Sequence, residues 1–186
     1  MRRVGPSSPP RRPHASAYMK PIRAYCHIAA PPEAVFEVIL DVDRYPEWNR
    51  FTPRMTMRTD EVAVGKEFDL DCQMTSEQLL EGEREVVLVL DREKLHFCMG
   101  TSRTRGRPGI KSFRWQKCEP SPGGGTDFEN YESFHGPLGP IVYLLFRKRL
   151  RRAFKNYCVA LEKRVLDLTR RPSHATSAGR RPQSPQ

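Results

Sequence analysis

Residues 138–168 have the sequence LGPIVYLLFRKRLRRAFKNYCVALEKRVLDL, the one long segment of the chain whose pattern predicts a single uninterrupted helix. Apolar residues recur along it at the three- and four-residue spacing of a helix with one buried stripe. The stripe consists of Leu138, Ile141, Val142, Leu145, Leu150, Phe154, Tyr157, Leu161, Val165 and Leu168. At about 1.5 Å per residue the helix is roughly 43 Å long from Pro140 to Leu168, so a single sheet that covers it has to curl around it.

The segments before this helix predict one strand, two short helices and about six further strands. Residues 21–30 alternate apolar and polar side chains as a strand does, and Pro31 and Pro32 end it. Short helices are expected over residues 33–40 and 41–49. The later strands are expected over residues 54–59, 67–74, 84–90, 94–100, 111–118 and 126–135.

This order of elements predicts an α+β domain, with the long terminal helix on one face of an antiparallel sheet. If the sheet curls strongly, a concave and mostly apolar pocket remains between sheet and helix. Pockets of this kind bind small molecules. The sequence therefore predicts one ligand-binding domain over residues 21–168.

The net charge of +10 comes almost entirely from the two ends of the chain. Of the 32 basic residues, nine lie in residues 1–20 and 169–186, which hold no acid, so 23 remain against all 22 acidic residues. Both ends have the composition of disordered basic tails. A near-neutral domain does not predict specific binding to nucleic acid.

The cysteines and histidines predict neither disulfides nor a metal site. The cysteines, odd in number and widely spaced, are Cys26, Cys72, Cys98, Cys118 and Cys158. They fit buried free thiols in a reducing compartment, so we expect a cytoplasmic protein. The five histidines lack the spacing of zinc ligands, and we expect no metal and no other cofactor. The longest apolar run, Ile141 to Phe146, is too short to span a bilayer.

Three motifs carry a resemblance to a known superfamily. They are APPEAVFEVILDVDRYPEWN at residues 30–49, GGT at residues 124–126, and FHGPLGP at residues 134–140. Together with the order of elements, they resemble the START/Bet v 1-like superfamily, also called SRPBCC, and within it the polyketide cyclase/dehydrase-like group. The resemblance covers residues 21–168. It implies the helix-grip fold, in which a curved seven-stranded antiparallel sheet wraps around the C-terminal helix, with two short helices between the first two strands.

The resemblance also implies a deep cavity for lipids, polyketides or other hydrophobic molecules. The leading hypothesis is therefore a protein that binds a hydrophobic small molecule between the sheet and the helix. The alternative is a polyketide cyclase/dehydrase, an aromatase/cyclase-type enzyme, acting in the same cavity. An acid or base buried in the cavity favours the enzyme, and an all-apolar cavity favours the carrier. A third hypothesis is a membrane-docking or chaperone-like protein.

The expected lining of the cavity is a set of apolar and aromatic side chains on the strands and the long helix. Either tryptophan can also orient a ligand through its indole N–H, although packing under the short helices is the other role open to Trp48. The predicted ligand-binding residues are Trp48, Phe68, Leu70, Cys72, Met74, Phe97, Met99, Trp115, Phe128, Phe134, Val142 and Leu145. The same residues would equally fill an ordinary core.

The last strand carries the candidate catalytic residues. If the face that holds Phe128 is concave, Asn130 and Glu132 project into the cavity, where burial raises the pKa of a carboxyl group and suits it to proton transfer. If the other face is concave, Tyr131 and His135 take that place. We favour the first arrangement because phenylalanines bracket it, and the candidates are Glu132, Asn130 and His135.

Two groups of arginines suggest contacts with anionic partners. Arg103, Arg105 and Arg107 lie on a loop, where they can gate the pocket, meet an anionic group of the ligand, or simply be solvated. On the long helix, a basic cluster directly follows the apolar run IVYLLF and can lie weakly on an anionic membrane surface. The cluster is Arg147, Lys148, Arg149, Arg151 and Arg152. The alternative interpretation is that these residues form the cationic, solvent-exposed face of a helix whose other face packs on the sheet.

Overall fold

The computed structural model describes residues 19–75, 77–101 and 108–170. Its elements are β1 (Ile22–Ile28), α1 (Pro32–Leu40), the 3₁₀ helix η1 (Val42–Arg44), α2 (Tyr45–Trp48), β2 (Arg54–Met57), β3 (Glu67–Gln73), β4 (Leu79–Asp91), β5 (His96–Thr101), β6 (Lys111–Pro120), β7 (Thr126–His135) and α3 (Gly139–Arg170). The tails predicted over residues 1–20 and 169–186 lie almost entirely outside the described residues, although α3 continues to Arg170.

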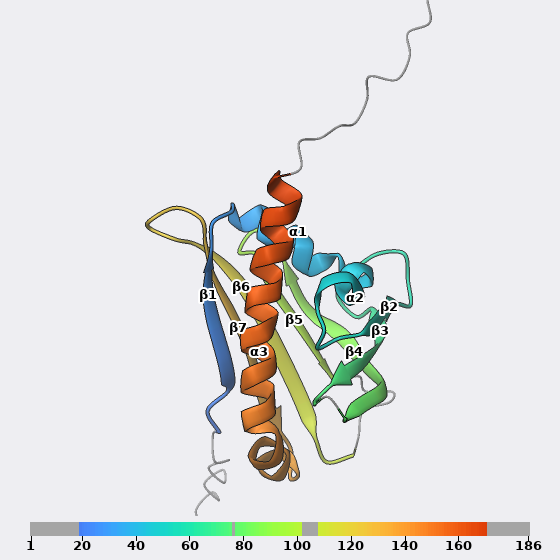
Figure 1. Cartoon of the computed structure of the whole chain (residues 1–186). Coiled ribbons are helices and arrows are strands. Elements are labelled where there is room, and N and C mark those ends of the chain that lie inside the picture. The colour runs from blue at the N-terminus through green and yellow to red at the C-terminus, as the bar shows by residue number, and fades with distance from the viewer. Residues whose placement is uncertain (1–18, 76, 102–107, 171–186) are drawn as a thin grey trace, which may run out of the picture.

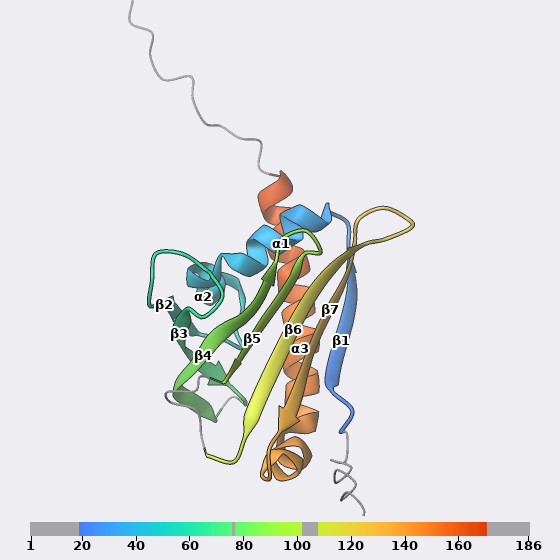
Figure 2. The ribbon, with the colours of Figure 1, turned by 180° about the vertical axis from the view of Figure 1, so that it is seen from behind.

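The seven strands form one antiparallel sheet in the order β1-β7-β6-β5-β4-β3-β2. Figure 1 shows α3 lying along the inner face of this curved sheet, and Figure 2 shows the outer face without a covering helix. Helix α3 packs mainly on β1 and β7, and α1 packs on β6 and α3. The predicted α+β class, the helix-grip arrangement and the position of the two short helices between the first two strands are confirmed.

Two elements differ most from their predicted bounds. Strand β4 begins at Leu79, five residues earlier than predicted, because Leu79 and Leu80 pair with the end of β3 past an irregularity in register between Leu70 and Cys72. The helix expected over residues 41–49 is divided into η1 and α2, and Pro46 lies in the first turn of α2. Proline is tolerated there because first-turn amides have no helical partner.

Both glycine motifs require glycine for steric reasons. Gly125 has a φ of +79°, and a Cβ atom there would lie 2.5 Å from the carbonyl oxygen of Ile28. Gly136 has a φ of +89°, and a Cβ atom there would lie 2.5 Å from the carbonyl oxygen of Gly109. Neither the left-handed backbone nor the close approach admits a side chain. The GGT turn therefore fits β7 against β1, and FHGPLGP fits the start of α3 against the loop before β6.

The stripe of α3 is buried only in its middle. Leu150, Phe154, Tyr157, Leu161 and Val165 are at most 5% exposed and pack in the core. The expectation that the whole stripe is covered is wrong at both ends. The exposed members of the stripe are Leu138 at 45%, Ile141 at 56%, Leu145 at 63% and Leu168 at 42%. The sheet grips the central turns of the helix and leaves its first turns in solvent.

No helix in the described ranges is long and apolar enough to cross a membrane. All five cysteines lie within those ranges and are free thiols.

Candidate functional site

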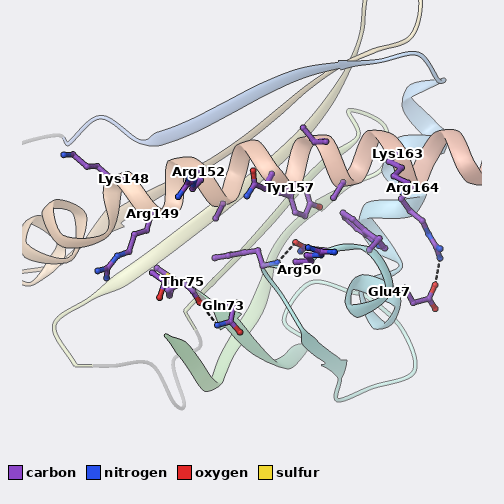
Figure 3. A pocket seen from close by; sticks show the side chains of 18 of the residues that line it. Glu47, Arg50, Gln73, Thr75, Lys148, Arg149, Arg152, Tyr157, Lys163 and Arg164 are labelled. Atoms are coloured by element: carbon purple, nitrogen blue, oxygen red, sulfur yellow. Dashed lines mark hydrogen bonds and ion pairs between the residues drawn. The ribbon is translucent and has the colours of Figure 1, made fainter. Parts of the chain in front are cut away.

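A groove of about 1320 Å³ runs along one side of α3. Figure 3 shows it between α3 and the opposite wall. That wall is formed by α2 with the residues that follow it and by the end of β3. The groove exists because α3 leans toward β1 and β7 and leaves the far side of the curved sheet uncovered.

The groove combines an apolar wall with many cations. Its apolar side chains include Trp48, Phe51, Met74 and Val159. Its basic residues are Arg50, Lys148, Arg149, Arg152, Lys163 and Arg164, and its acidic residues are Glu47 and Asp167. Across the groove, Arg164 Nη2 lies 2.7 Å from Glu47 Oε2, so five cations remain against Asp167. Such a site favours a ligand with an apolar body and a negative charge.

Tyr157 connects the groove to the interior of the domain. Its ring lines the groove, and its hydroxyl donates a hydrogen bond of 2.7 Å to Gln116 Oε1 on β6. The Tyr157 hydroxyl oxygen also lies 3.2 Å from the hydroxyl of Tyr45, which donates to the Ile39 carbonyl at 2.7 Å. Burial raises the pKa of both phenols, so they remain neutral hydrogen-bonding groups.

Behind Tyr157, the guanidinium of Arg114 is buried among aromatic rings. Its Cζ lies 4.9 Å from the ring centres of Phe154 and Tyr157 and 5.6 Å from that of Phe51. Its Nε donates to Asn130 Oδ1 at 3.1 Å. Cation–π contacts of this kind offset part of the free energy cost of burying the charge.

Three buried donors of this cluster have no hydrogen-bond partner among the described residues. They are Arg114 Nη2, Gln116 Nε2 and Asn130 Nδ2, from facing positions on β6 and β7. Buried polar groups are ordinarily satisfied by protein, water or ligand. The cluster is therefore suited to an oxygen acceptor, either ordered water or a carbonyl or carboxylate oxygen of a ligand.

Two carboxyl groups lie near Arg114 on the inner face of the sheet. Burial raises the pKa of Glu132 to about 7, although Arg114 and a hydrogen bond from Ser112 oppose the rise. Burial, with help from the nearby Glu132 charge, raises the pKa of Glu85 to about 8. Glu85 Oε2 is shielded from solvent and has no hydrogen-bond partner in the described ranges. Both groups can exchange a proton near neutral pH.

The predicted ligand-binding residues fall into separate environments. Trp48 and Met74 line the groove. Phe68, Leu70, Phe97, Met99 and Phe128 are fully buried core residues, at most 3% exposed. Cys72, Phe134 and Val142 are half-buried, and Leu145 is exposed to solvent.

Trp115 lies on the outer face of the sheet. It is opposite Tyr131 in register, and the two rings are stacked with centroids 6.3 Å apart. Lys117 Nζ lies 5.8 Å from the Trp115 ring centre, and Arg23 Cζ lies 4.7 Å from that of Tyr131. Because strand residues alternate between faces, the inner-face neighbours of Trp115 on β6 are Arg114 and Gln116.

Of the catalytic candidates, Asn130 and Glu132 lie on the inner face and His135 does not. The Phe128 ring lies 6.1 Å from the Tyr157 ring of α3, which identifies the Phe128 face of β7 as the inner one. His135 is exposed, packs edge-on against Phe113 and lies 3.0 Å from Ser133 Oγ. The loop arginines Arg103, Arg105 and Arg107 lie outside the described residues.

Several residues of the site were not predicted from the sequence. Arg114, Gln116, Glu85 and Tyr45 form or flank the buried cluster, and Arg50 and Lys163 line the groove. A partial signal exists for Arg114 and Gln116, because they alternate with Phe113 and Trp115, but either set fits an inner face. Within the described part of the chain, no three His, Cys, Asp or Glu side chains gather as metal ligands.

Comparison with known proteins gives a family match and a set of similar folds. Residues 20–166 match the model of a family described as polyketide cyclase/dehydrase and lipid transport. A search of curated proteins finds no match.

Among solved structures, the chain resembles the Zhui aromatase/cyclase of a Streptomyces species (14% identity, 81% of this chain and 96% of that chain, TM-score 0.65). It also resembles norcoclaurine synthase from Thalictrum flavum (14% identity, 90% of this chain and 99% of that chain, TM-score 0.62). A third similar structure is TTHA0849 from Thermus thermophilus (17% identity, 81% of this chain and 99% of that chain, TM-score 0.65). At these identities the likeness extends to the fold alone.

Proposed function

Because this chain belongs to the polyketide cyclase/dehydrase and lipid transport family, we propose that it binds a small amphipathic molecule in the groove beside α3. The ligand has an apolar body, of the lipid or polyketide kind, and an anionic group. This modifies the prediction of a purely hydrophobic ligand, and the observation that carries it is the composition of the groove.

The volume and the lining support this proposal. A groove of about 1320 Å³ is large enough for an acyl chain or a fused aromatic system. Trp48, Phe51 and Met74 supply apolar contact, while Arg50 and Lys163 are exposed cations of the same groove that form no ion pair with the described residues. A carboxylate, sulfonate or phosphate that meets them gains charge-assisted hydrogen bonds. A neutral ligand with the same body lacks them.

Calorimetric titration with two matched probes tests this proposal. Anilinonaphthalene sulfonate and N-phenylnaphthylamine share an aromatic body, and only the first carries a negative charge. We expect the sulfonate to bind more tightly to the wild type. The double variant Arg50→Gln/Lys163→Gln should weaken its binding about tenfold and leave the neutral probe unchanged.

The control variant for this titration is Arg92→Gln/Lys94→Gln. It removes the same charge at the turn between β4 and β5, where both side chains are exposed. Equal affinities of the two probes for the wild type, or an equal loss in the control variant, would contradict a groove that selects anionic ligands.

A second candidate function, proton transfer to or from the bound ligand, is favoured by the buried ionisable groups. Glu85, Glu132 and Arg114 are the type of residues expected for the alternative of a cyclase/dehydrase. None of the three lines the groove, since Phe51 and Tyr157 lie between. For a ligand to reach Glu132, these two rings have to move.

Deuterium exchange at the methyl group of acetophenone, followed by NMR, tests proton transfer directly. We expect exchange above the buffer rate that is lost in Glu132→Gln and kept in Glu119→Gln, a control at an exposed position on β6. Exchange at the buffer rate in the wild type would leave ligand binding as the supported function.

A further inference from the structure

The first turns of α3 form an exposed apolar tip. Leu138 is 45% exposed, Ile141 56%, Leu144 64% and Leu145 63%, and all four lie within eight residues. Figure 1 shows these turns at the end of the molecule opposite α1, beyond the sheet. Isolated exposed leucines are common on protein surfaces, but a cluster of four marks an interaction site.

A collar of cations follows the apolar tip along the helix. Arg147, Lys148, Arg149, Arg151 and Arg152 occupy the next turns, and four of them are exposed. The chain has no acidic residue between Glu132 and Glu162. The collar begins about 10 Å along the axis from Ile141, which matches the depth to which interfacial helices bury their apolar residues below the lipid headgroups.

We propose that the tip of α3, residues 138–152, docks on the surface of an anionic lipid bilayer. The leucines and Ile141 enter the boundary between headgroups and acyl chains, and the collar contacts lipid phosphates. A second copy of the chain is a poorer partner for this surface, because it would bring an equal cluster of positive charges against the collar. A bilayer supplies both the apolar phase and the negative charge.

The docking surface is continuous with the groove. Lys148, Arg149 and Arg152 belong to both, and Arg149 Nη1 donates to Gln78 Oε1 at 3.0 Å at the groove wall. Docking therefore places the mouth of the groove next to the lipid surface. The docking itself does not depend on what the groove binds, so the two proposals can fail separately.

Sedimentation of the full chain with vesicles tests the proposal. The vesicles are phosphatidylcholine with and without phosphatidylglycerol, at low and high salt. We expect binding to the anionic vesicles that weakens with salt. Leu144→Ser/Leu145→Ser should lower the partition coefficient about tenfold. Its control, Leu168→Ser, lies near the other end of the same helix, is 42% exposed, and should bind as the wild type.

A charge variant tests the collar without touching the groove lining. Arg147→Gln/Arg151→Gln should lower binding about thirtyfold, since each basic residue near an anionic surface contributes roughly a factor of five. The control Arg44→Gln/Arg92→Gln removes the same charge near α1, at the other end of the molecule.

Binding that is unchanged in both tip variants, or lost equally in their controls, would overturn the proposal. So would a wild type that is dimeric by analytical ultracentrifugation and becomes monomeric in Leu144→Ser/Leu145→Ser, because the tip would then be a protein interface. All four leucine and arginine positions are outside the buried core, and thermal melts confirm that each variant is folded.

Discussion

The two sides of α3 differ in what covers them. The side toward β1 and β7 is closed, and Leu161 and Val165 there are at most 1% exposed. The side toward α2 and the end of β3 is open and holds five cations outside the Arg164–Glu47 pair, beside an apolar wall. One amphipathic helix therefore provides both the core of the domain and one wall of its binding site. The packed side fixes the position of the groove, and the open side is free to carry charge.

The largest effect on stability is expected from a substitution on the closed side of α3. Leu161→Ala should lower the free energy of unfolding by about 2–5 kcal/mol, because Leu161 is 0% exposed and leaves a cavity. Val159→Ala, two residues earlier on the open side and 67% exposed, should change it by less than about 0.5 kcal/mol. Urea denaturation measures both variants, and similar losses would contradict the difference between the two sides.

The buried carboxyl groups predict how the stability of the domain depends on pH. The pKa of Glu85 is raised from 4.5 to about 8, and that of Glu132 from 4.5 to about 7. Between pH 4.5 and pH 8 the folded state therefore binds more protons than the unfolded chain. Their contribution to stability is complete below pH 4.5 and is lost as the pH rises toward 8.

Urea denaturation across this pH range checks the prediction. The double variant Glu85→Gln/Glu132→Gln should show a flatter profile than the wild type, because its amides do not titrate. Parallel profiles for the two proteins would mean that neither carboxyl group is held protonated in the fold.

A smaller effect is expected where the two sides meet, at Tyr157. Tyr157→Phe removes the 2.7 Å hydrogen bond and leaves Gln116 Oε1 buried without that donor, which should cost about 1–2 kcal/mol of unfolding free energy. Tyr25→Phe, at a tyrosine that is 65% exposed, is the matched control and should be near neutral. Thermal unfolding of the pair separates the buried hydrogen bond from the general effect of removing a hydroxyl.

The smallest effect concerns the ion pair across the groove. Arg164→Gln breaks the contact with Glu47, whose side chain is 49% exposed, so stability should fall by less than about 1 kcal/mol. Affinity for anilinonaphthalene sulfonate should also fall slightly, because Glu47 is then an unneutralised negative charge in the groove. A rise in affinity would show that Arg164 contributes no favourable charge to the site.

The sequence predicts the fold well because its signals are local. Gly124 and Gly125 of GGT and Gly136 of FHGPLGP occupy positive φ angles that other residues rarely adopt. The spacing of Leu150, Phe154 and Leu161 predicts the buried stripe. The uncovered ends of the stripe were not predicted, because helical spacing does not encode where the sheet stops. Ile141 and Leu145 fit the pattern and remain in solvent.

The interior of the site is harder to predict, because it depends on which face of β6 turns inward. The segment FRWQKC at residues 113–118 alternates aromatic with polar side chains, and hydrophobicity alone favours Trp115 inside. The structure places Arg114 and Gln116 there. Arg114 is tolerated because three aromatic rings surround it, and Trp115 is tolerated outside because Tyr131 and Lys117 cover its faces. Both compensations come from other elements.

The two tryptophans offer the most direct test of the central claim that ligand binds in the groove beside α3. Trp48 lines the groove and Trp115 lies on the opposite face of the sheet, and each has one indole N–H resonance in a proton–nitrogen NMR spectrum. Titration with anilinonaphthalene sulfonate should shift the Trp48 resonance progressively and leave that of Trp115 in place. A shift of Trp115 without one of Trp48, or no shift of either at saturation, would contradict the account.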